Sequence, residues 1–194
     1  MKSSFLSIIF LLTFSYAFAQ NTTTIKCDSI YKNKGITIKL INFDDEKDGY
    51  ENEKNSILII NQKINGKNST LIKDSIFSKV QEIEFKDFNN DKIKDILVQN
   101  ISDVRSNWTY NLYLYNSKTN NFKKVNGFEE IKNPSYHSKY KIIESHVNSG
   151  KNWVAFYKIK NFKVYDYNIE IIDDGSLKAE KEYRKAIKKI TEKK

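Results

Sequence analysis

The sequence predicts an all-β protein of antiparallel sheets joined by hairpins, arranged like propeller blades or as a sandwich, with one calcium loop between two strands. Apolar and polar residues alternate with a period of two in many short segments, which is typical of half-buried strands. Turn-forming pairs such as Asn65-Gly66 separate these segments. One loop, residues 87–95, places oxygen-bearing side chains at alternate positions, as calcium loops do.

The first residues have the pattern of a secretory signal peptide. Lys2 precedes a nearly continuous apolar stretch over residues 5–18, and Ala17-Phe18-Ala19 provides a small-residue cleavage site. We therefore predict a signal peptide over 1–19 and a single all-β domain over 20–194, exported to the periplasm or secreted. The apolar stretch is too short for a comfortable membrane anchor, so no membrane span is expected after cleavage.

The net charge limits the kinds of partner that we expect, and the cysteine content limits how the fold can be stabilised. The formal net charge is +9 and the pI is about 9.3, but the lysines are interleaved with acidic residues and no nucleic-acid-binding motif occurs. We expect the protein to bind no nucleic acid, and to bind instead an anionic envelope polymer or an acidic cleft on another protein. Cys27 is the only cysteine, so no intrachain disulfide is possible and stability must come from packing or metal.

Strands are predicted wherever the alternation is clear. In 110–115, Tyr110, Leu112 and Leu114 share one face while Tyr113 and Tyr115 share the other. In 153–159 both faces are apolar, as in a strand buried on both sides. The other expected strands lie near 36–40, 83–85, 96–98, 141–145 and 162–171. The expected hairpin turns are Asn65-Gly66, Asn116–Asn120, Ser149-Gly150 and Asp174-Gly175.

Three segments are less regular. The acidic stretch over 44–49 reads as a solvated loop with room for a second weak cation site. Pro134 is expected in a loop between two strands. Near the end of the chain, Tyr183, Ile187 and Ile190 fit a helical stripe, but we favour a hairpin returning from Asp174-Gly175 to about Tyr183, followed by a basic tail.

The loop over 87–95 is the strongest candidate site. Asp87, Asn89, Asp91 and Asp95 offer side-chain oxygens and Ile93 a backbone oxygen, a donor set suited to Ca²⁺. Strand-like segments flank the loop on both sides. The alternative is a plain turn rich in Asn and Asp, since these side chains commonly bond their local backbone.

The segment from Asp87 to Val98 resembles the calcium loop of FG-GAP and VCBS-type repeats, which form blades of β-propellers and occur in secreted adhesion proteins. Only one such loop occurs, so a full propeller is not expected. The order of segments from about 80 to 170 is also similar to a family of bacterial periplasmic lysozyme-inhibitor and immunity proteins. That resemblance rests on the loop, the hairpin around Tyr113–Phe122, Asn133-Pro134 and the strand 141–145, and it implies a bound calcium ion.

Periplasmic lysozyme inhibitors insert a loop with an S-G-x-x-Y motif into the cleft of the enzyme. Here the corresponding residues are Ser149, Gly150, Lys151 and Trp153, with tryptophan where tyrosine is expected. The resemblance implies that Ser149 and Lys151 contact the paired cleft carboxylates, that Gly150 permits a tight turn and that Trp153 is an aromatic anchor. The alternative is an ordinary hairpin turn at Ser149-Gly150.

No catalytic motif is present, and we expect no enzyme activity. The sequence leaves two functions open. The first is an exported calcium-binding β protein that binds and inhibits a lysozyme-type, cell-wall glycohydrolase. The second is a glycan- or surface-binding (adhesion) module, for peptidoglycan or polysaccharide, in which the calcium loop is purely structural and exposed Trp108, Tyr113 and Tyr115 stack on sugars.

Overall fold

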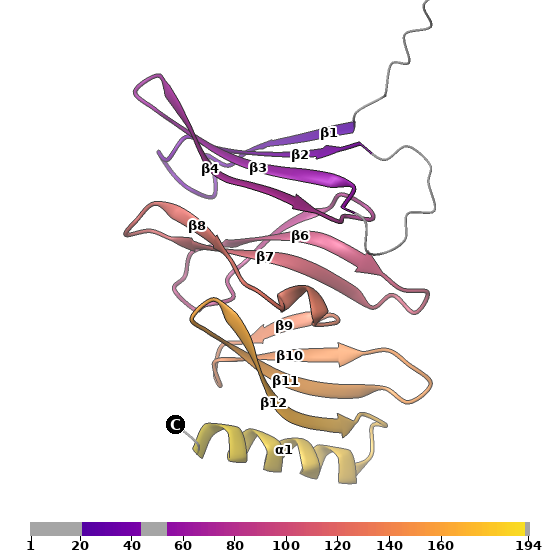
Figure 1. Ribbon diagram of the computed structural model, residues 1–194. Coiled ribbons are helices and arrows are strands. Elements are labelled where there is room, and N and C mark those ends of the chain that lie inside the picture. The colour runs from indigo at the N-terminus through magenta and orange to yellow at the C-terminus, as the bar shows by residue number, and fades with distance from the viewer. Residues whose placement is uncertain (1–20, 44–53, 193–194) are drawn as a thin grey trace, which may run out of the picture.

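The computed structural model describes residues 21–43 and 54–192. The predicted signal peptide and the acidic stretch over 44–49 lie outside the described residues. The described chain forms three four-stranded antiparallel sheets stacked face on face, with a C-terminal helix beneath the third sheet (Figure 1). This arrangement confirms the predicted fold class of antiparallel sheets joined by hairpins.

Each sheet is a meander, so that neighbouring strands in the chain are neighbours in the sheet. The first sheet contains β1 (Asn21–Lys26), β2 (Ile36–Asn42), β3 (Ser56–Ile64) and β4 (Lys67–Ile76). The second contains β5 (Ile83–Lys86), β6 (Asp95–Ser102), β7 (Trp108–Asn116) and β8 (Asn121–Lys124). A short 3-10 helix, η1 (Phe128–Glu130), leads to the third sheet, which contains β9 (Pro134–His137), β10 (Ile142–Val147), β11 (Trp153–Lys160) and β12 (Lys163–Ile172).

The turns follow the sequence signals in most places. Asn65 and Gly66 join β3 to β4 with φ of 50° and 79°, the left-handed values that a two-residue hairpin needs. The predicted turns at 116–120 and at Ser149-Gly150 join β7 to β8 and β10 to β11. The turn between β11 and β12 contains no glycine. Asn161 and Phe162 adopt the left-handed backbone angles there.

Apolar layers fill the spaces between the sheets. The middle sheet contributes to both, since Tyr113 and Tyr115 of β7 pack toward the first sheet while Leu112 and Leu114 pack toward the third. The two predicted faces of this strand are therefore correct. Phe156, fully buried on β11, belongs to a third layer between the last sheet and the helix, while Tyr157 and Ile159 of the same strand pack toward the middle sheet. β11 is therefore covered on both faces, as predicted.

The prediction of a C-terminal hairpin is wrong, and the alternative helical pattern is correct. Residues Leu177–Glu192 form helix α1, with Ala186, Ile187 and Ile190 buried against the third sheet. Ser176 precedes the helix and its Oγ accepts a hydrogen bond from the Ala179 N–H at 3.1 Å, which is an N-cap. Asp174-Gly175 therefore leads from β12 into a helix. Pro134 is likewise the first residue of β9 rather than part of a loop, a position where its missing N–H is tolerated.

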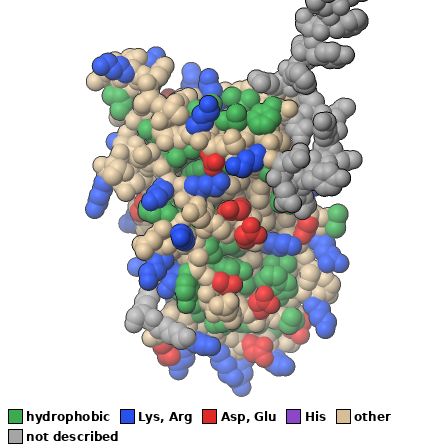
Figure 2. Space-filling view, viewed as in Figure 1, with side chains coloured by type: hydrophobic (Ala, Val, Ile, Leu, Met, Phe, Trp, Pro, Cys, Tyr) green, Lys and Arg blue, Asp and Glu red, His purple; other side chains and the backbone are tan. Residues whose placement is uncertain are grey.

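The surface is mixed in charge. Figure 2 shows Lys and Arg side chains on all layers of the visible face, with Asp and Glu among them. No described helix is both long and apolar enough to cross a membrane.

Candidate functional site

The 87–95 loop connects β5 to β6 and is shaped by its own acidic side chains. The Asp87 carboxylate accepts hydrogen bonds from the backbone N–H groups of Asn90 at 2.6 Å and Lys92 at 2.9 Å. Both of these residues have left-handed φ, 61° and 69°. Asp91 Oδ1 accepts from the Ile93 N–H at 2.8 Å. The Asx bonds that make these residues common in turns therefore fix the loop.

Asp95 holds the loop to the middle sheet. Its side chain is fully buried, and its two oxygens accept the N–H groups of Phe88 at 2.8 Å and Tyr115 at 3.0 Å. Burial, helped by the neighbouring charges of Asp91 and Asp87, raises the pKa of Asp95 to about 7, although the two backbone hydrogen bonds act to lower it. The negative charges of Asp87 and Asp91 therefore act on the Asp95 carboxylate. A cation would relieve this repulsion.

The donor set fits calcium in its chemistry. Asp87, Asn89, Asp91 and Asp95 present oxygens that each accept N–H bonds but keep further lone pairs, and a carboxylate has about four acceptor sites in all. Within the described part of the chain, however, no three acidic, His or Cys side chains converge closely enough to share one ion. Calcium binding, including the backbone oxygen of Ile93 as a ligand, stays a prediction.

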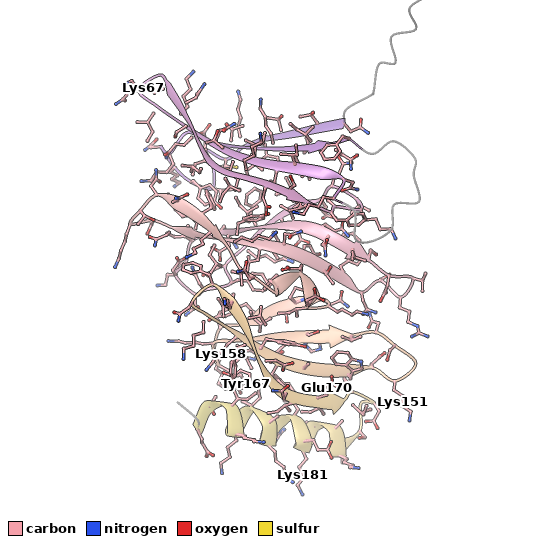
Figure 3. All side chains as sticks on the ribbon, viewed as in Figure 1. Lys67, Lys151, Lys158, Tyr167, Glu170 and Lys181 are labelled. Atoms are coloured by element: carbon pink, nitrogen blue, oxygen red, sulfur yellow. The ribbon has the colours of Figure 1, made fainter. Side chains whose placement is uncertain are left out.

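The second predicted site, formed by Ser149, Gly150, Lys151 and Trp153, lies in and beside the 148–152 loop, at the opposite edge of the stack from the 87–95 loop. The 148–152 loop connects the end of β10 to the start of β11, whereas the 87–95 loop ends where β6 begins (Figure 1). Asn107 anchors it from the middle sheet, with Nδ2 donating to the Asn148 carbonyl at 2.8 Å and Oδ1 accepting the Asn148 N–H at 2.8 Å. The loop is therefore fixed at its base, while Lys151 projects into solvent (Figure 3).

The side chains of this loop differ in what they offer a partner. The Ser149 hydroxyl donates to the Lys151 carbonyl of its own turn. Gly150 does not adopt a positive φ, and a Cβ there would meet nothing within 4 Å, so no tight turn requires glycine. Trp153 is half-buried at the start of β11, paired with Val147 and Ile172. The hollow beside the loop is lined by Asp173 and Asp174, which disfavour an approaching acidic cleft.

A groove of about 680 Å³ runs between the middle and third sheets, on the same edge as the 87–95 loop. Four connections meet there: the β5–β6 loop with Asn89 and Asp91, the β7–β8 turn, the residue before β10 and the β11–β12 turn. Half-buried Tyr136 and Phe162 provide aromatic surface. The other lining residues are Phe88, Leu114, Tyr115, Asn116, Ser117, Lys118, Lys141, Ile143, Lys158, Ile159 and Asn161.

The structure corrects the expected exposure of two aromatic side chains. Tyr113 and Tyr115 were expected to be exposed for stacking on sugars, but they are 0% and 3% exposed because they fill the layer toward the first sheet. Trp108 is half-buried against Tyr110. Tyr136 and Phe162 were not predicted as site residues, since they lie far apart in the sequence, on β9 and in the β11–β12 turn, and line one groove only in the folded chain.

Comparison with known proteins adds no assignment: no family model, no curated protein and no solved structure matches this chain.

Proposed function

We propose that this is an exported, calcium-stabilised β protein that binds a glycan in the groove between its middle and third sheets. The observation that carries the proposal is the groove itself, about 680 Å³ in volume and walled by Tyr136 and Phe162. Aromatic side chains with polar neighbours suit sugars, because a pyranose ring has an apolar face and a polar rim. Lys123 Nζ lies 4.3 Å from the centre of the Phe162 ring, in a cation–π contact.

Retention of the purified protein on insoluble peptidoglycan and on immobilised polysaccharides tests the proposal. Phe162→Ala is expected to weaken binding about fivefold or more, since it removes an aromatic wall. Trp153→Ala is the matched control, because Trp153 is also half-buried but lies at the opposite edge. Equal retention of both variants and the parent would contradict a glycan site in this groove.

Inhibition of a lysozyme-type glycohydrolase is the second candidate. The fixed base of the 148–152 loop and the projecting Lys151 favour it, because a preformed loop loses little entropy on entering a cleft. Lysis of peptidoglycan suspensions, followed by turbidity with and without the protein, tests it. Inhibition should weaken in Lys151→Ala and Ser149→Ala and persist in Phe162→Ala. If no lysozyme class is slowed, this second function is lost and the glycan proposal is untouched.

A further inference from the structure

We infer that the ligand of the groove is an acidic sugar chain, and that a pocket beneath the third sheet holds one of its carboxylate-bearing units. The inference rests on the proposed function and names the class of glycan. It starts from a separate pocket of about 240 Å³ between the third sheet and α1. The volume is below that of sites for drug-sized ligands, and suits a single ring.

The walls of this pocket combine tyrosines with lysines from three elements. Tyr165 and Tyr167 lie on β12, with ring centres 5.5 Å apart at nearly a right angle. Tyr140 precedes β10, and Lys189 comes from the last turns of α1. Burial raises the pKa of Tyr167, and Tyr165 beside it raises it further, so the Tyr167 hydroxyl stays a neutral hydrogen-bond donor. The pocket therefore offers aromatic faces, a hydroxyl donor and positive charge.

The lysines of the pocket have no acidic partner among the described residues. Lys158 Nζ lies 4.9 Å from the ring centre of Tyr165 and 5.3 Å from that of Tyr167, and it makes no ion pair. Lys141 and Lys189 make none either, whereas Lys124 and Lys132 elsewhere are paired with Asp74 and Asp103. No carboxylate lines the pocket. Three lysines that line one recess and have no acidic partner favour an anionic ligand.

The pocket and the groove adjoin at the edge of the third sheet. Lys141 and Lys158 are among the lining residues of both. Figure 3 shows Lys158 and Tyr167 side by side at the edge of the third sheet, far from Lys151. A chain molecule lying along Tyr136 and Phe162 would therefore reach these lysines with its next unit. Asp91 is the one carboxylate among the groove-lining residues, at the far end from α1.

The pocket favours carboxylate over phosphate. Arginine, whose planar fork binds phosphate through two parallel hydrogen bonds, lines neither the pocket nor the groove. Lysine acts as a point charge and imposes no such paired geometry on its ligand. The opposite edge shows the contrast, since the hollow there is lined by Asp173 and Asp174 and would repel the same ligand.

Binding to polygalacturonate, to its fully methyl-esterified form and to a glycan with phosphodiester links tests the inference. The full chain should bind polygalacturonate best, and esterification should weaken binding about tenfold or more, since it removes the charge. Lys158→Gln is expected to weaken polygalacturonate binding about three- to tenfold and Lys158→Gln/Lys189→Gln further, with a smaller dependence on salt. Lys151→Gln/Lys181→Gln removes the same charge from exposed sites away from the pocket and should change little.

The outcomes separate the two proposals. Equal binding of the acidic and esterified polymers, reduced by Phe162→Ala, would overturn the acidic assignment and keep the glycan groove. Tightest binding to the phosphodiester polymer would overturn the choice of carboxylate. Equal losses in the Lys158/Lys189 and Lys151/Lys181 variants would mean that net charge alone acts, which also overturns the pocket. No binding to any polymer would remove both proposals. Circular dichroism and melting of each variant confirm that it is folded.

Discussion

Gly35, in the turn before β2, has a backbone that other residues rarely adopt. Its φ is 59°, and a Cβ at this position would lie 2.2 Å from the backbone oxygen of Lys63. That contact cannot relax easily, because Lys63 also donates its N–H to the Gly35 carbonyl at 2.9 Å. We expect Gly35→Ala to lower the free energy of unfolding by about 2–4 kcal/mol, from strain and overlap together.

Urea unfolding followed by tryptophan fluorescence measures this loss. Gly150→Ala is the matched control, since its added methyl group meets open space and its φ is not left-handed. It should leave the free energy of unfolding unchanged or raise it by up to about 1 kcal/mol, by restricting the unfolded chain. A stable Gly35→Ala would contradict the close approach of β3 to this turn.

At the scale of single residues, the sequence predicted which face of a strand a side chain occupies better than whether that face is covered. Alternation placed Tyr113 and Tyr115 opposite Leu112 correctly. Their burial depends on the first sheet, which lies earlier in the chain, from Asn21 to Ile76. The lysines of the pocket could not be predicted either. Lys158 and Lys189 line one pocket only when α1 packs against the third sheet.

Among the elements, the 87–95 loop leads to a direct prediction about calcium. Adding calcium to metal-stripped protein should raise the melting temperature, since a ligand that binds only the folded state stabilises it by about 2.7 kcal/mol at a hundred times its dissociation constant. Asp87→Asn/Asp91→Asn should abolish the rise, whereas Asp173→Asn/Asp174→Asn, with the same change in charge, should keep it. Titration calorimetry gives the affinity. A melting temperature indifferent to both calcium and chelator would reject the site.

The helix is tied to the third sheet by one buried carboxylate. Glu144 on β10 is 6% exposed, accepts the Tyr183 hydroxyl of α1 at 2.6 Å and lies 3.3 Å from His146 Nε2. Burial raises the pKa of Glu144, but the hydrogen bonds from His146 and Tyr183 outweigh it, so the net pKa is lowered. The hydrogen bond to Glu144 raises the pKa of His146, helped by the charge of Asp173 and opposed by burial.

These shifts predict the pH at which the helix is held best. The lowered pKa of Glu144 adds stability above its ordinary value of 4.5, and that stability is lost as the pH falls through the folded pKa. The raised pKa of His146 adds stability below 6.5, and that stability is lost as the pH rises through the folded pKa. The contribution of the pair should therefore peak between pH 4.5 and 6.5.

Unfolding measured across pH 4 to 8 for the parent and for His146→Gln checks this window. The difference between the two should be largest inside it and should shrink above it. Tyr183→Phe should cost about 1–2 kcal/mol throughout, because Glu144 loses a hydrogen bond while buried. Arg184→Gln, which removes an exposed pair with Glu180, should cost at most about 0.5 kcal/mol. A pH-independent difference for His146→Gln would reject the ion pair.

The preference for a hairpin over α1 shows how two short patterns compete. Leu177, Ala179 and Lys181 alternate as in a strand, but Leu177 is 86% exposed and contributes nothing to the core. The longer pattern of Tyr183, Ile187 and Ile190 extends over more turns, and the third sheet supplies the apolar face that it needs. Turn signals such as Asp174-Gly175 do not distinguish a hairpin from the start of a helix.

For the whole molecule, α1 acts as the cover of the last sheet. Without it, Val154, Phe156 and Ile171 would lose the side chains that bury them. A chain ending at Ser176 is expected to bind a hydrophobic dye strongly and to elute as aggregates in size-exclusion chromatography. A chain ending at Glu192 should behave like the parent. If the shorter chain stays monomeric and binds no dye, the packing described for this layer is wrong.

The antiparallel sheets were predictable at this scale, and their stacking was not. Period-two alternation and turn pairs specify meanders, because both are local. The stacking order depends on which apolar faces meet, and three similar sheets look alike in the sequence. For the same reason the groove could not be predicted, since its lining residues come from four separate connections and from the strands beside them.

The meander connectivity sends every connection of the middle and third sheets to one of two margins, and each margin is built from short turns outside the apolar layers. One margin contains the 87–95 loop with Lys141 and Lys158, and the other contains Asn107 and the 148–152 loop. A turn can change length or residues without disturbing a packed layer, so the two margins can diverge independently. A scaffold of this kind can acquire a new ligand on one side while it retains the old one on the other.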